Sequence, residues 1–280
     1  MLQINSKQQK NLTIVKAAAP RTLGLSLGQL RGVIILPSIL LALAAWQTIV
    51  MLGDFPAFIL PGPALVWKKG MEVFLNGTLL LHTSVTLLEV LSGLIGGSLL
   101  ATVLAYWLAK YPLLEELVSP YLVAYQAIPI VALAPLLVIW FGPGIFSKSL
   151  ISGLIVFFPV LINTVVGLKA VPVNLRDLLK SMKANRWQTL RYLELPSALP
   201  VMLGGLRIGA TLSVIGAVVG EFVGSNRGLG YLINVGRGQY DTALVFVAVF
   251  TLIVLALCLY GFVILLEHAF LSWRKNPHFD

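Results

Sequence analysis

Few side chains in this 280-residue chain could do chemistry, and most of these lie within or beside long apolar segments. We single out Glu89, Gln126, Trp140 and Glu221 as possible lining of a solute path, because polar and ionisable groups at membrane depth are costly and usually functional. Each has a structural alternative. Glu89 and Glu221 could pair with or cap neighbouring helices, Gln126 could hydrogen-bond between helices, and Trp140 could belong to an interfacial aromatic belt instead of stacking on a flat ring.

Patterns for catalysis or metal binding are missing. The histidines, His82, His268 and His278, lack metal-ligand spacing, and no paired carboxylates are expected at membrane depth. The segment GPGIFSKS (142–149) is similar to a phosphate-binding loop, but Ser147 stands where that loop requires glycine. We therefore predict no catalytic residue, no metal site, no bound cofactor and no ATP hydrolysis by this chain.

The composition indicates that a membrane surrounds these side chains. Hydrophobic residues make up 58% of the chain and charged residues only 11%, whereas soluble domains carry roughly 25% charged residues. Because about 20 apolar residues cross one bilayer, we predict an all-α polytopic membrane protein with about six transmembrane helices. The predicted spans are 33–52, 85–108, 121–141, 150–168, 208–222 (starting earlier, near 199) and 243–266.

Prolines and glycines interrupt several of these spans. Pro129 and Pro135 lie in the third span, Pro159 lies in the fourth, and Gly93 and Gly97 are in the second. In lipid, backbone groups freed by a helix break need partners, so the prolines imply a packed bundle or a cavity lining. Small residues four positions apart permit close contact between helices.

Lysine and arginine are unevenly distributed around the predicted spans. With the amino terminus inside, roughly three quarters of the 20 Lys and Arg residues fall on the cytoplasmic side. This bias explains the formal charge of +9 without nucleic acid. We expect both termini to be cytoplasmic, with an amino-terminal tail over 1–32, a transmembrane domain over 33–268 and a carboxyl-terminal tail over 269–280.

The segment 171–200, between the fourth and fifth spans, is too polar to cross lipid. Its apolar residues Leu175, Leu178, Leu179 and Met182 fall on one face at helical spacing. This pattern predicts a short amphipathic helix.

A second short helix is predicted to follow a break at 184–185. Asn185 and Gln188 have the spacing of a capping box at its start, and Pro196 and Pro200 are expected to end it. Two short helices at an angle would form a docking surface for another protein, or the segment would lie on the membrane surface.

Segment 171–200 resembles the signature loop of permease subunits in binding-protein-dependent ABC importers. That loop reads Glu-Ala-Ala, three residues, Gly, nine residues, then an aliphatic residue, any residue, Leu and Pro. Asp177, Leu178 and Leu179 occupy the Glu-Ala-Ala positions, and Lys183 replaces the glycine. Because lysine disfavours the left-handed conformation, we expect the turn to have moved to Asn185. The resemblance implies ATPase-coupling roles for Asp177, Leu178, Leu179, Met182, Lys183, Trp187, Leu193, Leu195 and Pro196.

The resemblance extends over residues 60–271, including QAIPIVALAPLLVIWFGPG (126–144) and GEFVGSNRGLGYLI (220–233). It is to the branch of sulfonate, taurine, nitrate, thiamine-precursor and riboflavin permeases. The QAIP motif and a Glu in the second span are more similar to the heterocycle importers than to the sulfonate importers. The implied cargo is therefore riboflavin or the pyrimidine precursor of thiamine, and a sulfonate or nitrate is less favoured.

Membership of this family would imply a division of labour among several proteins. Two permease subunits, either copies or paralogues, would form the pore in a bacterial inner membrane. Two separate ATPase subunits would bind ATP and hold the loops 171–200, and an extracytoplasmic solute-binding protein would deliver the cargo. ATP-driven closure of the ATPases would move a rigid loop and switch the pore between two states.

Two other classes of protein would have different sequence features. An ion-coupled secondary transporter, our alternative, is expected to have inverted repeats and an ion site at mid-bilayer, but no repeat is visible and the candidate carboxylates lie toward span ends. An integral-membrane enzyme would need a cluster of His, Asp and Glu, and the sequence shows none.

Overall fold

A computed structural model describes residues 27–271, with side chains from residue 37 onward, and all its regular elements are helices. The tails predicted at 1–32 and 269–280 lie mostly outside these residues. Helix α1 (Leu27–Gly53) belongs to a unit of its own. The other elements are α2 (Pro63–Leu75), α3 (Thr78–Lys110), α4 (Pro112–Ala127), α5 (Ile130–Phe141), α6 (Ile145–Lys169), α7 (Val173–Ser181), α8 (Arg186–Thr189), the π-helical turn η2 (Leu190–Glu194), α9 (Leu195–Gly224), α10 (Leu229–Gly238) and α11 (Thr242–Phe270).

Long apolar helices dominate the part of the chain that the structure describes. Four of them are long and apolar enough to cross a membrane, namely Thr78–Lys110, Ile145–Lys169, Arg186–Gly224 and Thr242–Phe270. A fifth crossing results if α4 and α5 together form one broken span. In addition, α1 covers the first predicted span and keeps an apolar stretch over Pro37–Gly53. The prediction of an all-α polytopic protein is confirmed.

The third predicted span, 121–141, is not one straight helix. Helices α4 and α5 meet at 92°, and the break falls at Ile128 and Pro129, which both have extended backbone conformations. Proline has no N–H to donate and pushes the residue before it out of the helical region. Pro135 and Pro159, by contrast, lie inside α5 and α6 without ending them.

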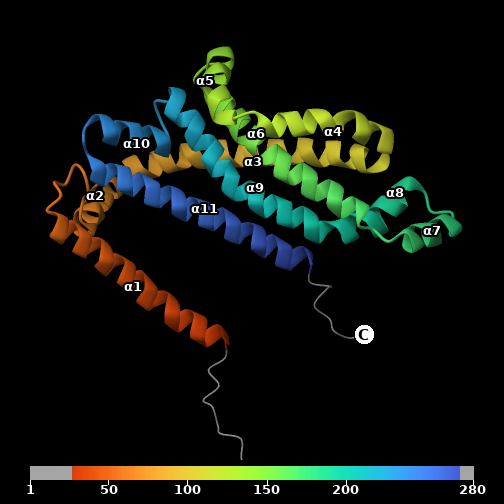
Figure 1. Cartoon of the computed structure of the whole chain (residues 1–280), viewed down its shortest axis with the longest axis horizontal. Helices are drawn as coiled ribbons and strands as arrows, with labels where there is room; N and C mark the ends of the chain where they lie inside the picture. Colours follow the sequence, from red (N-terminus) through yellow and green to blue (C-terminus); the bar gives the residue numbers. More distant parts are fainter. Residues whose placement is uncertain (1–26, 272–280) are drawn as a thin grey trace, which may run out of the picture. The chain divides into compact units, whose positions relative to one another are not determined.

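The core lies between α3, α6, α9 and α11, which pack along one another (Figure 1). Helix α6 runs between α3 and α9, and glycines set the close approach on both sides. A Cβ at Gly97 of α3 would meet the carbonyl oxygen of Gly153 at 2.5 Å, and a Cβ at Gly216 of α9 would meet the Cα of Ser152 at 2.5 Å. The close contact predicted for Gly93 and Gly97 is therefore confirmed.

The bundle has two different ends, visible in Figure 1. At one end, which we call the loop end, α7, α8 and η2 lie beside the last turns of α3 and α6. At the other, the α10 end, α10 packs against α9 and α11 beside the first turns of α3. The polar groups of the candidate site are divided between these ends.

Candidate functional site

Segment 171–200 forms the two short helices predicted from its pattern, but the turn between them was placed wrongly. Lys183 has φ +56°, in the left-handed region, whereas Asn185 is extended at φ −75° and ψ 168°. Helix α7 closes over this turn through hydrogen bonds from the amides of Lys183 and Ala184 to the carbonyls of Lys180 and Leu179. These bonds and the following cap fix the backbone, so the lysine adopts the conformation that glycine favours.

The start of α8 is capped as its sequence predicts. The Asn185 side chain accepts a hydrogen bond from the Gln188 amide at 2.8 Å, and the Gln188 side chain accepts one from the Asn185 amide at 2.8 Å. This capping box satisfies two backbone donors that the first helical turn leaves free. It sets the direction in which the chain leaves the turn at Lys183.

Pro196 and Pro200 do not end the second helix, contrary to the prediction. Arg186–Gly224 is one continuous 39-residue helix. The turn before Pro196 is π-helical over Leu190–Glu194, so its hydrogen-bond pattern changes just where the proline cannot donate. The loop helix and the long apolar helix α9 therefore form a single rod.

Apolar side chains of this loop are exposed. None of the α7 residues is buried; the exposed fractions are 56% for Leu178, 70% for Met182 and 66% for Trp187. Leu195 is exposed and Leu179 and Pro196 are half-buried, whereas Leu193 is buried against the bundle. Asp177 lies on the polar side of α7 and pairs with Lys180 at 3.1 Å. The loop thus presents an unpartnered apolar face at one end of the bundle.

Glu194 ties the loop to the bundle, a role that the sequence analysis missed. It is almost fully buried, and its carboxylate lies 2.5 Å from the Lys110 ammonium at the end of α3 and 3.8 Å from Arg176 Nε of α7. Arg176 also donates a hydrogen bond to the Leu168 carbonyl of α6 at 2.7 Å. The sequence signal for this role is the position of Glu194 between the apolar residues Leu193 and Leu195. The loop is therefore bonded to both α3 and α6.

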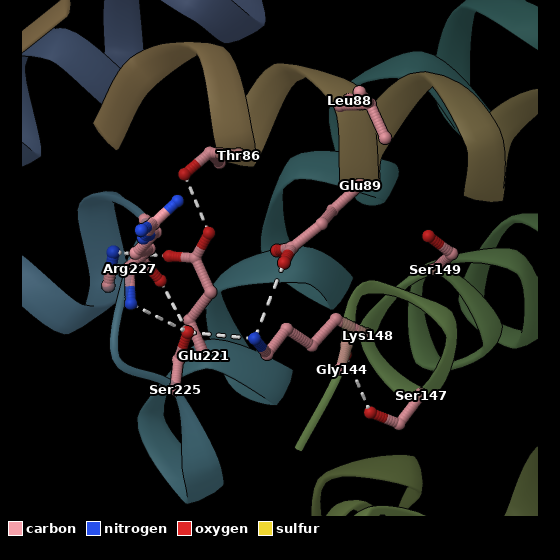
Figure 2. Close-up of polar contacts among 12 residues, drawn as sticks. Thr86, Leu88, Glu89, Gly144, Ser147, Lys148, Ser149, Glu221, Ser225 and Arg227 are labelled. Atoms are coloured by element: carbon pink, nitrogen blue, oxygen red, sulfur yellow. Dashed lines mark hydrogen bonds and ion pairs between the residues drawn. The ribbon is translucent and has the colours of Figure 1, made fainter. Parts of the chain in front are cut away.

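At the α10 end, three charged side chains from three helices meet inside the bundle. Glu89 of α3, Lys148 of α6 and Glu221 of α9 have exposed fractions of 0%, 3% and 1%. Lys148 Nζ lies 3.4 Å from Glu89 Oε1 and donates a hydrogen bond to Ser225 Oγ at 2.8 Å (Figure 2). We call these three residues the buried charge cluster; the expectation that carboxylates would not come together was wrong.

The same cluster holds the start of α10. Thr86 donates a hydrogen bond to Glu221 Oε1 at 2.6 Å and accepts one from the Leu229 amide at 2.8 Å. The Gly230 amide donates to Glu221 Oε2, and the Gly228 amide donates to His82 Nδ1 at 2.9 Å. A carboxylate at a helix amino terminus is favoured because the backbone N–H groups there are unpaired.

Glycine is required where α10 begins. Gly228 has φ +109°, and a Cβ there would overlap the Glu221 carboxylate. A Cβ at Gly230 would lie 2.8 Å from Glu221 Oε2. The segment 220–233 therefore combines an acid with the glycines that let backbone amides reach it.

The other two candidates for a solute path lie apart from this cluster. Gln126 is exposed at the break between α4 and α5, and Trp140 is 66% exposed near the end of α5. Among the described residues, no three His, Cys, Asp or Glu side chains are placed to hold a metal ion. His82 instead stacks on Tyr231 with ring centroids 5.6 Å apart.

A more exposed ion pair connects α2 to α11 at the α10 end. Lys69 Nζ lies 3.0 Å from Asp241 Oδ2, and Asp241 also caps α11 by accepting a hydrogen bond from the Leu244 amide at 3.0 Å. The hydrogen bond to Asp241 raises the pKa of Lys69 above its ordinary value of 10.5, and partial burial opposes this shift. Lys69 therefore remains charged at neutral pH.

Known proteins are similar to this chain in sequence and in fold. The family model described as "Binding-protein-dependent transport system inner membrane component" matches residues 93–271. The riboflavin transport system permease protein RibX of Chloroflexus aurantiacus is 45% identical over 239 residues, covering 85% of this chain and 89% of the relative. The formylaminopyrimidine transport permease protein ThiX of Halalkalibacterium halodurans is 35% identical, covering 85% and 94%.

More distant similarities agree with these. The putative aliphatic sulfonates transport permease protein SsuC of Bacillus subtilis is 31% identical, covering 89% of each chain. Among solved structures, an inward-facing form of the methionine ABC transporter MetNI matches with TM-score 0.56 and 19% identity, covering 71% of this chain and 97% of that one. At that identity the match concerns the fold alone.

Proposed function

The chain belongs to the family of binding-protein-dependent transport system inner membrane components, the permease subunits of ABC importers, and we propose that it couples to its ATPase through loop 171–200 and carries a nitrogen heterocycle. As a member of this family it is a multi-pass inner-membrane transport subunit that works with an ATPase and a binding protein, not an enzyme. The single observation behind the coupling proposal is the exposed apolar face of loop 171–200 on a rod that continues into α9.

The loop meets the physical requirements for transmitting force. Leu178 and Met182 offer apolar contact area to a partner, whereas Leu193 and Glu194 are buried against the bundle. The contacts of Glu194 with Lys110 and Arg176 link α7 to α3, and η2 joins α8 to α9 without a break. A displacement of the loop would therefore move α3 and α9 together, whereas a flexible linker could not transmit such a movement.

This role fixes the orientation that we propose. The loop end faces the cytoplasm, where the ATPase is, and the α10 end faces outward, where the binding protein arrives. In this arrangement both chain termini are cytoplasmic, and the tails 1–32 and 269–280 flank a transmembrane domain over 33–268. We propose that a second permease subunit, a copy or a paralogue, completes the pore, because the described long helices pack around a core of buried apolar side chains.

The coupling role is tested by lowering the charge by one unit on each face of α7. Leu178→Asp should reduce copurification of the ATPase subunit with the permease and abolish uptake, because a carboxylate would be buried in an apolar contact. Lys180→Gln lowers the charge by the same one unit on the other face of the same helix, where the lysine side chain is exposed, and should leave both measurements near wild type. Normal uptake by Leu178→Asp, or equal losses in both variants, would exclude this face as the ATPase contact.

The proposed cargo is riboflavin or a thiamine pyrimidine precursor. Its support is the 45% identity to RibX and the 35% identity to ThiX, compared with 31% to SsuC. A binding protein encoded beside the gene of this permease is expected to bind riboflavin or formylaminopyrimidine in calorimetric titration, and not taurine or nitrate. Binding of a sulfonate alone would overturn the cargo and leave the coupling role untouched.

Glu89 and Glu221 would act on the solute path indirectly, by fixing α10 and the outer end of α9. Gln126 and Trp140 remain candidates for direct contact, since both side chains are exposed. Cargo uptake by Gln126→Leu and Trp140→Leu, compared at equal membrane levels, tests this. A raised KM with intact ATPase binding would support a place on the path, and unchanged kinetics in both would remove them from it.

A further inference from the structure

Two adjoining clefts lie at the loop end of the bundle and share Tyr106 and Trp107 as a common wall. The first has a volume of about 300 Å³, and its remaining lining is Lys110, Tyr111 and Arg186. The second has a volume of about 230 Å³, and its remaining lining is Thr102, Val103, Thr164, Leu168, Leu190, Leu195 and Met202. One cleft is therefore cationic and aromatic, and its neighbour is almost entirely apolar.

The cationic cleft carries excess positive charge. Lys110 and Arg176 share the single carboxylate of Glu194, and Arg186 has no acidic partner among the described residues. Trp107 stacks on Tyr111 with ring centroids 5.6 Å apart, and Lys110 lies 5.7 Å above the Tyr106 ring. This arrangement suits an anion whose neighbouring atoms are apolar enough to rest on aromatic rings.

The apolar cleft lies farther along α3, toward the middle of the bundle. It is bounded by α3, α6, η2 and α9, and most of its lining side chains are apolar. A free phosphate or a nucleotide would fill the first cleft and leave this second one empty. A hydrocarbon chain attached to an anionic group would fill both.

We propose that the two clefts bind one anionic phospholipid. Its phosphate would lie between Lys110 and Arg186, and one acyl chain would pass Tyr106 and Trp107 into the apolar cleft. The depth is appropriate, because α3 ends at Lys110 and α6 ends at Lys169, the level at which spans leave the hydrocarbon. Basic pockets between helices on the cytoplasmic side are suited to anionic headgroups, so the inference rests on the orientation proposed above.

A lipid here would connect the coupling loop to α3. Arg186 is the first residue of α8, at the start of the rod that continues into α9, whereas Lys110 ends α3. A shared phosphate would therefore add a second link beside the one that Glu194 makes. Transport should then depend on anionic lipid even where the ATPase is fully bound.

The test uses the full chain assembled with its ATPase in nanodiscs that contain phosphatidylglycerol and phosphatidylcholine. Native mass spectrometry should find one retained phosphatidylglycerol, and Arg186→Gln should weaken its retention about fivefold. Arg191→Gln removes an exposed cation beside Tyr192, outside both clefts, and should change nothing. Met202→Trp, which fills the apolar cleft, should also release the lipid.

The proposal would be overturned by equal retention of phosphatidylcholine, by an equal loss in Arg191→Gln, or by full retention in both Arg186→Gln and Met202→Trp. Displacement of the lipid by millimolar inorganic phosphate alone would likewise assign the first cleft to a free anion. ATPase copurification, measured on the same samples, separates these outcomes from a failure of the coupling proposal. It should stay at wild-type level in Arg186→Gln, because the apolar face of α7 is unchanged.

Discussion

The two ends of the bundle use charge and apolar surface in opposite ways. At the α10 end, Glu89, Lys148 and Glu221 are sealed inside the protein, where they bond three helices and the start of α10. At the loop end, the charges of Lys110 and Arg176 are about one third exposed, and apolar side chains such as Met182 face outward. Buried charge fixes one end, whereas exposed apolar surface leaves the other end free to accept a partner.

This contrast has an energetic basis. A charge removed from water is tolerated only when it is paired, and deleting one partner leaves the other without compensation. Ion pairs that retain contact with water contribute far less, because each charge can be rehydrated. Substitutions at the α10 end should therefore act mainly on stability, and those at the loop end mainly on coupling.

The largest effect is expected for Lys148→Met. It leaves Glu89 and Glu221 buried without a cation, which should cost about 3–5 kcal/mol of stability, measured as thermal unfolding of the purified chain in detergent. Adding Glu89→Gln to this variant should recover much of the loss. Lys169→Met, at the exposed end of the same helix, is the matched control; an equal loss in that variant would contradict the contrast between the ends.

A smaller effect on stability and a larger one on coupling are expected for Glu194→Gln. Lys110 and Arg176 can be rehydrated, so the loss should be about 1–2 kcal/mol. The ATPase should still copurify, but uptake per ATP hydrolysed should fall because the loop no longer moves α3. Glu115→Gln, which removes an exposed partner of Lys169, should leave this ratio unchanged. An unaltered ratio in Glu194→Gln would mean that the link to α3 does not transmit movement.

The turn at Lys183 should become more stable if this lysine is replaced by glycine. Lys183 has φ +56°, and a residue with a Cβ loses roughly 1 kcal/mol in that conformation. Lys183→Gly is expected to raise the free energy of unfolding by about 0.5–1 kcal/mol. Ser181→Gly, two residues earlier in helical conformation, should instead lower it by a few tenths. Destabilisation by Lys183→Gly would show that the lysine side chain has a contact of its own.

The smallest effect concerns the half-buried pair of Lys69 and Asp241. Because Asp241 raises the pKa of Lys69 in the folded state, the pair stabilises the protein fully below pH 10.5, and this contribution is lost as pH rises through the folded-state value. Lys69→Met should therefore lower the unfolding temperature at pH 8 and match wild type at strongly alkaline pH. Lys68→Met, at an exposed neighbour without a partner among the described residues, should differ from wild type at neither pH.

Local sequence pattern alone was enough to predict a large part of this protein's structure. The apolar windows predicted the long helices, because lipid requires backbone groups to be satisfied within each helix. The capping box at Asn185 needs only residues three apart, so it was also foreseeable. The motif of loop 171–200 and the segments beyond it identified the permease family, which the comparisons confirm.

Contacts between distant residues were decided only by the tertiary structure. The approach of Glu89, Lys148 and Glu221 depends on how three helices pack, and nothing in their spacing reveals it. The same holds for Glu194, which bonds to Lys110, 84 positions away, and for the left-handed Lys183, whose neighbours outweigh its own preference. Pro129 marked a break, but its 92° angle depends on where α4 and α5 pack. The sequence of each segment determines which side chains it can bury, and the packing of the helices determines which of these side chains come into contact.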